Sequence, residues 1–177
     1  GYKAGILACL MTGATMVPLP VFDVDAAVDA IESERISMIP GPPTLYQTLL
    51  HHPRFDRTRV DTLRLAVTGA AVVPVELVVA MQAELGFETV LTAYGLTEAS
   101  GVVTVCRSDD SPETIAATSG RAIPGVEVIV VDDDGDRLGV GEPGEVLVRG
   151  YNVMREYFED PAQTAEAIDA DGWLHTG

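Results

Sequence analysis

The stretch Leu91-Thr92-Ala93-Tyr94-Gly95-Leu96-Thr97-Glu98 joins an apolar, β-favouring run to four residues of different chemistry. Ligands collect at the C-terminal ends of strands in α/β sheets, and residues 90–93 predict such a strand end. Tyr94 offers a flat face for stacking an adenine there, and Gly95 lets backbone come close. Thr97 can donate to a phosphate oxygen, and Glu98 can hold the accompanying Mg²⁺. The same residues are equally compatible with an ordinary strand end that carries a solvated Glu. Short motifs of this kind can match by chance.

A second strand end precedes this one. Residues 63–68 form an apolar run that leads into Gly69-Ala70-Ala71, after which a helix is predicted over residues 74–85. Residues 87–93 are the next strand, so both strand ends are expected at the same edge of a largely parallel sheet. A base would then be held between Ala70-Ala71 and Tyr94. Close packing of helix on strand explains the three small residues equally well.

The chain before this point alternates predicted helices and strands. They are a buried helix over residues 2–11, a strand over 14–19, a helix over 24–34, a strand over 36–40 and a helix over 44–51. Asp23 is placed to cap the second of these helices, whose apolar residues fall on one face. His51 and His52 end the third helix without a Cys or carboxylate cluster beside them, which indicates helix-end residues rather than metal ligands.

The pattern changes after a short strand at residues 102–106 and an acidic loop. Strands are predicted over residues 126–132 and 144–149, a helix from Asp160 to residue 168, and a last strand over 173–177. Asp134-Gly135 is a hairpin signal. The acidic run at residues 132–136 fails the calcium-loop template, because Gly141 stands where the bidentate Glu belongs, and it predicts a solvated turn.

Composition indicates a globular protein with two lobes. Hydrophobic residues make up 47% and charged residues 21% of the 177 residues. The net charge of −16 argues against nucleic acid or an anionic membrane as a partner, since both need a basic face. Cys9 and Cys106 lie in apolar runs and are expected as buried free thiols, with a disulfide between them as the alternative. The apolar run at residues 4–11 is far shorter than the roughly 20 residues of a membrane span, so no membrane insertion is expected.

Five motifs in a fixed order resemble those of the adenylate-forming superfamily, which comprises acyl-CoA synthetases, peptide-synthetase adenylation domains and firefly-type luciferases. They are Thr68-Gly69-Ala70-Ala71, Tyr94-Gly95-Leu96-Thr97-Glu98, residues 120–125 with Val131-Asp132 and Gly135, Gly144-Glu145-Val146 with Arg149-Gly150, and residues 173–177. Residues 40–46 and the Trp-Leu-His-Thr-Gly ending are similar to acyl-CoA synthetases in particular. Residues 1–18, 90–100 and 167–177 resemble actinobacterial ligases that attach coenzyme A to a propionate on a two-ring steroid remnant.

The resemblance implies an α/β fold that is part of the acyl-CoA synthetase N-terminal domain. Residues 1–106 would be an α/β lobe with a mostly parallel sheet and helices, and residues 107–177 a small β-rich, barrel-like lobe. The implied activity is ATP-dependent: a carboxylate attacks the α-phosphate to give an acyl-adenylate, which coenzyme A converts to a thioester. The implied acid is a steroid-ring propionate or a fatty acid, with ATP/AMP and Mg²⁺ as cofactors and the cytoplasm as location.

The resemblance also assigns residues. Thr97 and Glu98 would be catalytic, with Thr97 on the α-phosphate and Glu98 as the metal ligand. The nucleotide-binding set would be Gly69, Ala70, Ala71, Thr92, Tyr94, Gly95 and Thr97, and the acyl-pocket set Gly41, Thr68, Gly69, Gly95, Ala99 and Ser100. Thr92 departs from the family pattern, which often has Asn or Gln there for the adenine amino group.

Several parts of the family pattern are missing from the 177 residues. The phosphate loop is expected upstream of Gly1, and the ribose-binding Asp, the hinge and the C-terminal lid with its catalytic lysine are expected beyond Gly177. The sequence therefore carries half of an adenylation site and is expected to be inactive alone. Two alternatives stay open: another adenylating enzyme that activates an amino acid or aryl acid, and a nucleotide-binding remnant without catalysis.

Overall fold

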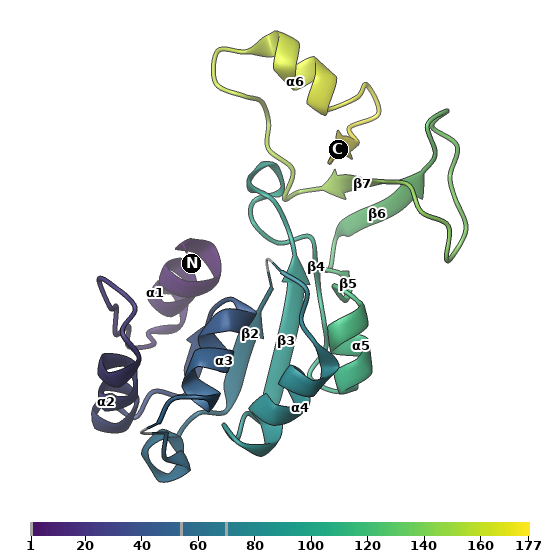
Figure 1. Ribbon diagram of the computed structural model, residues 1–177. Helices are drawn as coiled ribbons and strands as arrows, with labels where there is room; N and C mark the ends of the chain where they lie inside the picture. The colour runs from purple at the N-terminus through teal and green to yellow at the C-terminus, as the bar shows by residue number, and fades with distance from the viewer. Residues whose placement is uncertain (1, 54, 70) are drawn as a thin grey trace. The chain divides into compact units, whose positions relative to one another are not determined.

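The computed structural model describes residues 2–53, 55–69 and 71–177, and of residues 2–4 only the backbone. The chain forms two compact units (Figure 1). Unit 1 comprises Gly1–Ala93 and Cys106–Gly120, and unit 2 comprises Tyr94–Val105 and Arg121–Gly177. No helix within the described residues is long and apolar enough to cross a membrane.

Unit 1 is built on parallel strands. Strand β1 (Met38–Pro40) pairs in parallel with β2 (Leu65–Thr68), and β2 pairs in parallel with β3 (Thr89–Tyr94). Thr68 stands opposite Thr92 in this register, so the carboxyl ends of β2 and β3 meet at one edge. The predicted mostly parallel α/β arrangement is confirmed.

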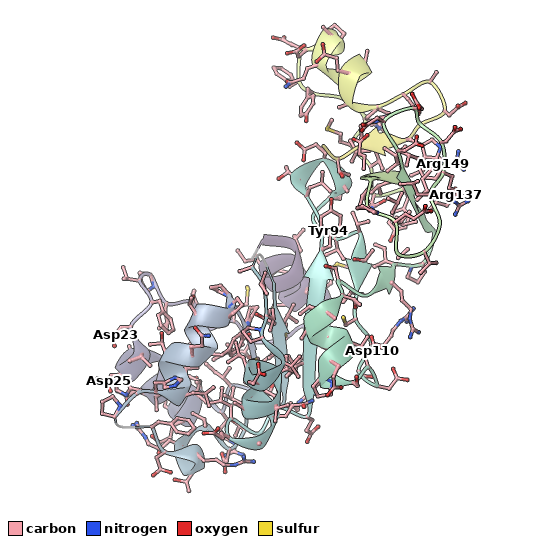
Figure 2. The ribbon with its side chains drawn as sticks, turned by 45° about the vertical axis from the view of Figure 1, so that its right-hand side comes forward. Asp23, Asp25, Tyr94, Asp110, Arg137 and Arg149 are labelled. Carbon is pink, nitrogen blue, oxygen red and sulfur yellow. The ribbon has the colours of Figure 1, made fainter. Side chains whose placement is uncertain are left out.

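Three helices contribute buried side chains to the core of unit 1, and each begins where the sequence signals it (Figure 1). They are α2 (Val24–Glu34), α3 (Pro43–Leu50) and α4 (Val75–Ala83). Asp23 caps α2 by accepting a hydrogen bond of 2.8 Å from the backbone N–H of Ala26, and Figure 2 shows it at the start of that helix. Proline begins α3 and precedes α4, where a missing N–H costs nothing. A 3₁₀ turn, η2 (Arg57–Val60), leads toward β2.

Tyr46 is the largest side chain that is fully buried in unit 1. Its hydroxyl donates to the carbonyl oxygen of Ile39 at 2.8 Å and lies 3.2 Å from that of Val67, so one side chain joins the ends of β1 and β2. Its ring meets Phe87 edge to face, with centroids 5.8 Å apart. Burial raises the pKa of Tyr46 well above its usual range, and the hydroxyl therefore stays a donor.

The N-terminal predictions are partly wrong. A helix is present, as a π-helical segment η1 (Tyr2–Leu7) followed by α1 (Ala8–Thr12), but it is not buried: Leu10 is 66% and Met11 86% exposed. Residues 14–19 form no strand. Proline lacks the N–H that a ladder needs, and apolar character alone does not tell whether a partner covers a segment. Cys9 is accordingly only half-buried, whereas Cys106 is buried, and both are free thiols.

The acidic loop predicted after Cys106 contains a helix, α5 (Pro112–Ala117). Ser111 caps it by accepting a hydrogen bond of 3.3 Å from the N–H of Thr114, and Pro112 opens it. Its one fully buried side chain, Ile115, joins the core of unit 1. The prediction of a plain loop was wrong because six residues give too few apolar positions for a helical period to be recognised.

Unit 2 is mainly antiparallel. Strand β4 (Thr104–Val105) pairs with β5 (Arg121–Ala122), and β6 (Val126–Val131), β7 (Glu145–Gly150) and β8 (Leu174–His175) form a second sheet in that order. Helix α6 (Pro161–Ala167) is capped by Asp160, where the sequence predicted the start of a helix. Asp132 closes the hairpin turn by accepting from the N–H groups of Asp134 and Asp136 at 3.0 and 2.8 Å.

Polar side chains tie the three strands of the second sheet together. Arg149 donates to both carboxylate oxygens of its cross-strand neighbour Glu127, each at 3.0 Å, and its guanidinium stacks 4.3 Å from the ring centre of Trp173. Glu145 pairs with His175 at 3.1 Å. Desolvation opposes ionisation of Glu145, but the backbone N–H of Gly177 and the His175 side chain together hold its pKa below the usual value.

Candidate functional site

Glycines follow the carboxyl ends of β1 and β2 in unit 1. Gly41 donates its N–H to the carbonyl of Val67 at 3.0 Å, and a Cβ on Gly41 would lie 2.7 Å from the Cδ1 of Leu45. A Cβ on Gly69 would lie 3.2 Å from the carbonyl oxygen of Ala93. Glycine at position 69 therefore lets the chain leaving β2 pass close beside β3.

Two buried threonine residues lie at this edge of the sheet, and their hydroxyls differ in hydrogen bonding. Thr68 is 3% exposed, and its Oγ1 has no hydrogen-bond partner within the described part of the chain. Thr92 is 5% exposed, and its Oγ1 lies 3.0 and 3.1 Å from the carbonyl oxygens of Ile115 and Thr118 and 3.0 Å from the Sγ of Cys106. The Thr92 hydroxyl is thus already used inside unit 1. Its predicted contact with adenine stays a prediction.

The other residues that were predicted to contact the base differ in their exposure. Ala70 lies outside the described residues, and Ala71 is exposed. Tyr94 is the last residue of β3, as Figure 2 shows, and its half-buried ring packs against the apolar cluster of unit 2 around Val103 and Val126. Tyr94 is therefore neither fully buried nor fully exposed, which is compatible with a ring that stacks on a base.

A tight turn in unit 2 gathers the other predicted residues. It contains the 3₁₀ segment η3 (Thr97–Ala99) and closes with the N–H of Gly101 on the carbonyl of Leu96 at 2.9 Å. Ser100, at φ 57°, ends η3 in the left-handed region. Thr97 is exposed, whereas Ala99 is fully buried in the unit 2 core. The predicted place of Ala99 in the acyl pocket stays a prediction.

Gly95 is required by this turn. A Cβ on Gly95 would collide with the carbonyl oxygen of Gly101, and it would lie 2.6 Å from the carbonyl carbon of Gly101 and 2.8 Å from the Cα of Val102. Every one of these atoms belongs to the backbone, which cannot rotate away as a flexible side chain can. Glycine at position 95 therefore permits a close contact with the chain's own backbone at Gly101 and Val102.

Glu98 is half-buried and points one carboxylate oxygen at a single donor. The hydroxyl of Tyr157 donates to Glu98 Oε1 at 2.9 Å, and no described residue donates to Oε2. The bond to the Glu98 carboxylate, then burial, raise the pKa of Tyr157, so the phenol is a donor at neutral pH.

A divalent cation at Glu98 would be coordinated by one carboxylate and not by a full set of protein ligands. Among the described residues, no three His, Cys, Asp or Glu side chains come together as a metal-binding group. Mg²⁺ is usually held by one or two carboxylates together with substrate phosphates and water, rather than by a protein cage. The Oε2 atom without a donor therefore fits a magnesium–nucleotide complex.

Sequence analysis missed the residues that support this turn. The N–H of Met154 donates to the carbonyl of Glu98 at 2.6 Å, and the side-chain Nδ2 of Asn152 donates to the carbonyls of Ala99 and Val102 at 3.3 and 3.0 Å. These partners are about fifty residues away along the chain. No local sequence pattern predicts a hydrogen bond between residues that are so far apart in the chain.

A parallel α/β sheet accompanied by a small antiparallel sheet is the architecture of the N-terminal domain of adenylate-forming enzymes. The chain belongs to the AMP-binding enzyme family, whose sequence profile matches residues 1–158. The predicted resemblance and the predicted fold class are confirmed.

Two curated relatives match the whole chain. Both are named 3-[(3aS,4S,7aS)-7a-methyl-1,5-dioxo-octahydro-1H-inden-4-yl]propanoyl:CoA ligase, one from Rhodococcus jostii (strain RHA1) and one from Mycobacterium tuberculosis (strain ATCC 25618 / H37Rv), and each is 55% identical over 177 residues. The chain spans 32% and 33% of their lengths. The structure of ATP-bound MatB from Rhodopseudomonas palustris matches with a TM-score of 0.83 at 31% identity, covering 96% of this chain and 33% of that one.

Proposed function

We propose that the complete gene product is an ATP-dependent acyl-CoA ligase. It would join a small carboxylic acid to AMP with release of pyrophosphate, and then transfer the acyl group to the thiol of coenzyme A. The observation that carries this proposal is the 55% identity, over every residue of the chain, with two relatives named as propanoyl:CoA ligases. Residues 1–106 and 107–177 would serve as two lobes of the AMP-binding domain in the cytoplasm.

The chain's own residues would bind and orient the nucleotide. Tyr94 would stack on the adenine, with Gly69 and Ala71 among the residues on the other side of the base. The exposed hydroxyl of Thr97, to which no described residue is bonded, would donate to the α-phosphate. Negative charge grows on the phosphoryl oxygens as the carboxylate attacks, so a donor fixed at a turn favours the transition state over the ground state.

Glu98 would hold Mg²⁺ through the carboxylate oxygen that no described residue occupies. The ion, when bound, neutralises phosphate charge and makes pyrophosphate a better leaving group. The role of Glu98 is then to keep a negative charge at one fixed place. The main-chain bond from Met154 and the phenol of Tyr157 support that role.

The proposed acid is a propionate carried by a two-ring, steroid-derived skeleton. The names of the two 55%-identical relatives describe a propanoyl group on a fused two-ring dione, which supports this choice over a fatty acid. The acyl pocket would draw on Gly41, Thr68, Gly69, Gly95, Ala99 and Ser100. The buried Thr68 hydroxyl without a partner would be available to a polar group of the acid.

The proposal is tested with the complete gene product, ATP, Mg²⁺ and coenzyme A. A two-ring propionate, a medium-chain fatty acid, a long-chain fatty acid, an aryl acid and an amino acid are offered separately, and thioesters are identified by mass. We expect a thioester from the two-ring propionate. Thioesters from fatty acids alone would keep the chemistry and overturn the steroid assignment, and no thioester from any acid would overturn the ligase.

Matched variants test the proposed metal ligand. Glu98→Gln should lower turnover strongly, whereas Glu156→Gln, which removes an exposed carboxylate of the same unit, should not. The isolated 177 residues belong in the same assay. We propose that they release no pyrophosphate with any acid, and acid-dependent release would contradict this.

A further inference from the structure

The Glu98 carboxylate meets a phenol that the sequence motifs do not explain. Tyr157 lies 59 positions further along the chain, and its hydroxyl donates to Glu98 Oε1 at 2.9 Å. A glutamate side chain that must hold a cation has three rotatable bonds, and it loses that freedom when the cation binds. A donor that already fixes one oxygen removes part of this loss in advance.

Tyr157 is placed by contacts other than its bond to Glu98. Its own backbone N–H donates to the Oγ1 of Thr164 in α6 at 2.9 Å. The segment before it is held to the Glu98 turn by the Met154 N–H, and by Asn152, which is 4% exposed. Removing the phenol oxygen would therefore release the carboxylate and leave the backbone of the turn where it is.

The chemistry of the partner also suits a cation site. A phenol donates one hydrogen bond and adds no charge, so Glu98 keeps its full negative charge. An Arg or Lys in the same place would fix the carboxylate equally well and would repel the cation. Oε2 takes no bond from any described residue and is the atom left for coordination.

Resting on the proposed function, we propose that Tyr157 is a positioning residue for magnesium–nucleotide binding. Its hydroxyl holds Glu98 in one rotamer, so the cation meets a carboxylate that is already oriented. Tyr157 itself touches neither the metal nor the nucleotide. The expected effect of losing the hydroxyl is about a fivefold to tenfold rise in the Mg²⁺ concentration that gives half-maximal rate, as for releasing one side chain.

The test compares Tyr157→Phe with Tyr151→Phe in the complete gene product. Both changes remove one phenol oxygen, but Tyr151 is 76% exposed. For Tyr157→Phe we expect the half-saturating Mg²⁺ concentration to rise by that factor, with kcat at saturating Mg²⁺ changed less than about twofold. Tyr151→Phe should match the wild type. Equal Mg²⁺ dependence for the two variants would overturn the proposal.

A binding measurement separates positioning from a structural role. The affinity for a non-hydrolysable ATP analogue is measured by calorimetry, once with Mg²⁺ and once with EDTA. Tyr157→Phe should weaken binding only with Mg²⁺, and it should add nothing further in a Glu98→Gln background. Equal weakening in EDTA would show a structural role and overturn the proposal. A wild type whose binding ignores Mg²⁺ would overturn the metal site of the proposed function as well.

Discussion

Replacing Gly95 by alanine tests the close approach inside the Thr97–Glu98 turn. The added Cβ would lie 2.6 Å from the carbonyl carbon of Gly101 and would meet its oxygen more closely still. Backbone atoms must move apart to admit it, and overpacking of this kind costs about 1–3 kcal/mol. We expect a value near the upper end, about 3 kcal/mol, because no flexible side chain can yield.

Hydrogen exchange measures this cost locally. The N–H of Gly101 is bonded to Leu96 at 2.9 Å, and that of Val103 to Tyr94 at 2.8 Å. A local loss of about 3 kcal/mol corresponds to roughly 100-fold faster exchange of these amides. The peptide covering residues 94–105 is followed by mass spectrometry in the complete gene product, and the amides of β2 serve as the internal reference.

The matched control is Gly5→Ala. Gly5 lies in η1, and a Cβ there meets nothing within 4 Å. Alanine in a helix is favoured over glycine by about 0.5–1 kcal/mol, so this change should leave the exchange of residues 94–105 as it is. If Gly95→Ala exchanged like Gly5→Ala, the argument that the turn leaves no space for a side chain would be refuted.

Three further predictions concern the core and the second sheet. Tyr46→Phe should cost about 1–3 kcal/mol, because it leaves buried carbonyls without their donor, and denaturant unfolding measures it. Asn152→Asp should destabilise more than Asn152→Ala, since it turns a carboxylate toward the carbonyls of Ala99 and Val102; thermal unfolding ranks the two. The lowered pKa of Glu145 contributes stability that is full above pH 4.5 and is lost as the pH falls through the folded-state pKa. Glu145→Gln should therefore unfold more easily than wild type at pH 7, and this difference should shrink as the pH falls below 4.5.

The elements that sequence could predict are those whose signals are local. Asp23 before an amphipathic run gave α2, and proline gave the starts of α3 and α4. Apolar runs of four to six residues between helices gave the parallel strands β2 and β3, since a strand buried on both faces reads as one continuous run. The ordered motifs gave the family, because their order carries more information than any one of them.

The parts that sequence did not reveal depend on partners distant in the chain. Nothing local to Tyr157 says that its hydroxyl meets a carboxylate 59 positions away. Nothing local to residues 14–19 says whether a neighbouring strand exists to pair with them. Nothing local to Gly95 says that a Cβ there would meet the backbone of Gly101, and its predicted ligand contact stays a prediction. A glycine in a sequence indicates that something lies close to the backbone, but it does not identify the neighbouring group.

The stacking of Arg149 on Trp173 gives this chain an optical reporter. Trp173 is the single tryptophan of the 177 residues, and the guanidinium of Arg149 lies 4.3 Å from its ring centre. Indole emission is sensitive to a nearby charge and to water. Within these residues the tryptophan emission therefore reports on the β7–β8 side of unit 2 and not on unit 1, which contains no tryptophan.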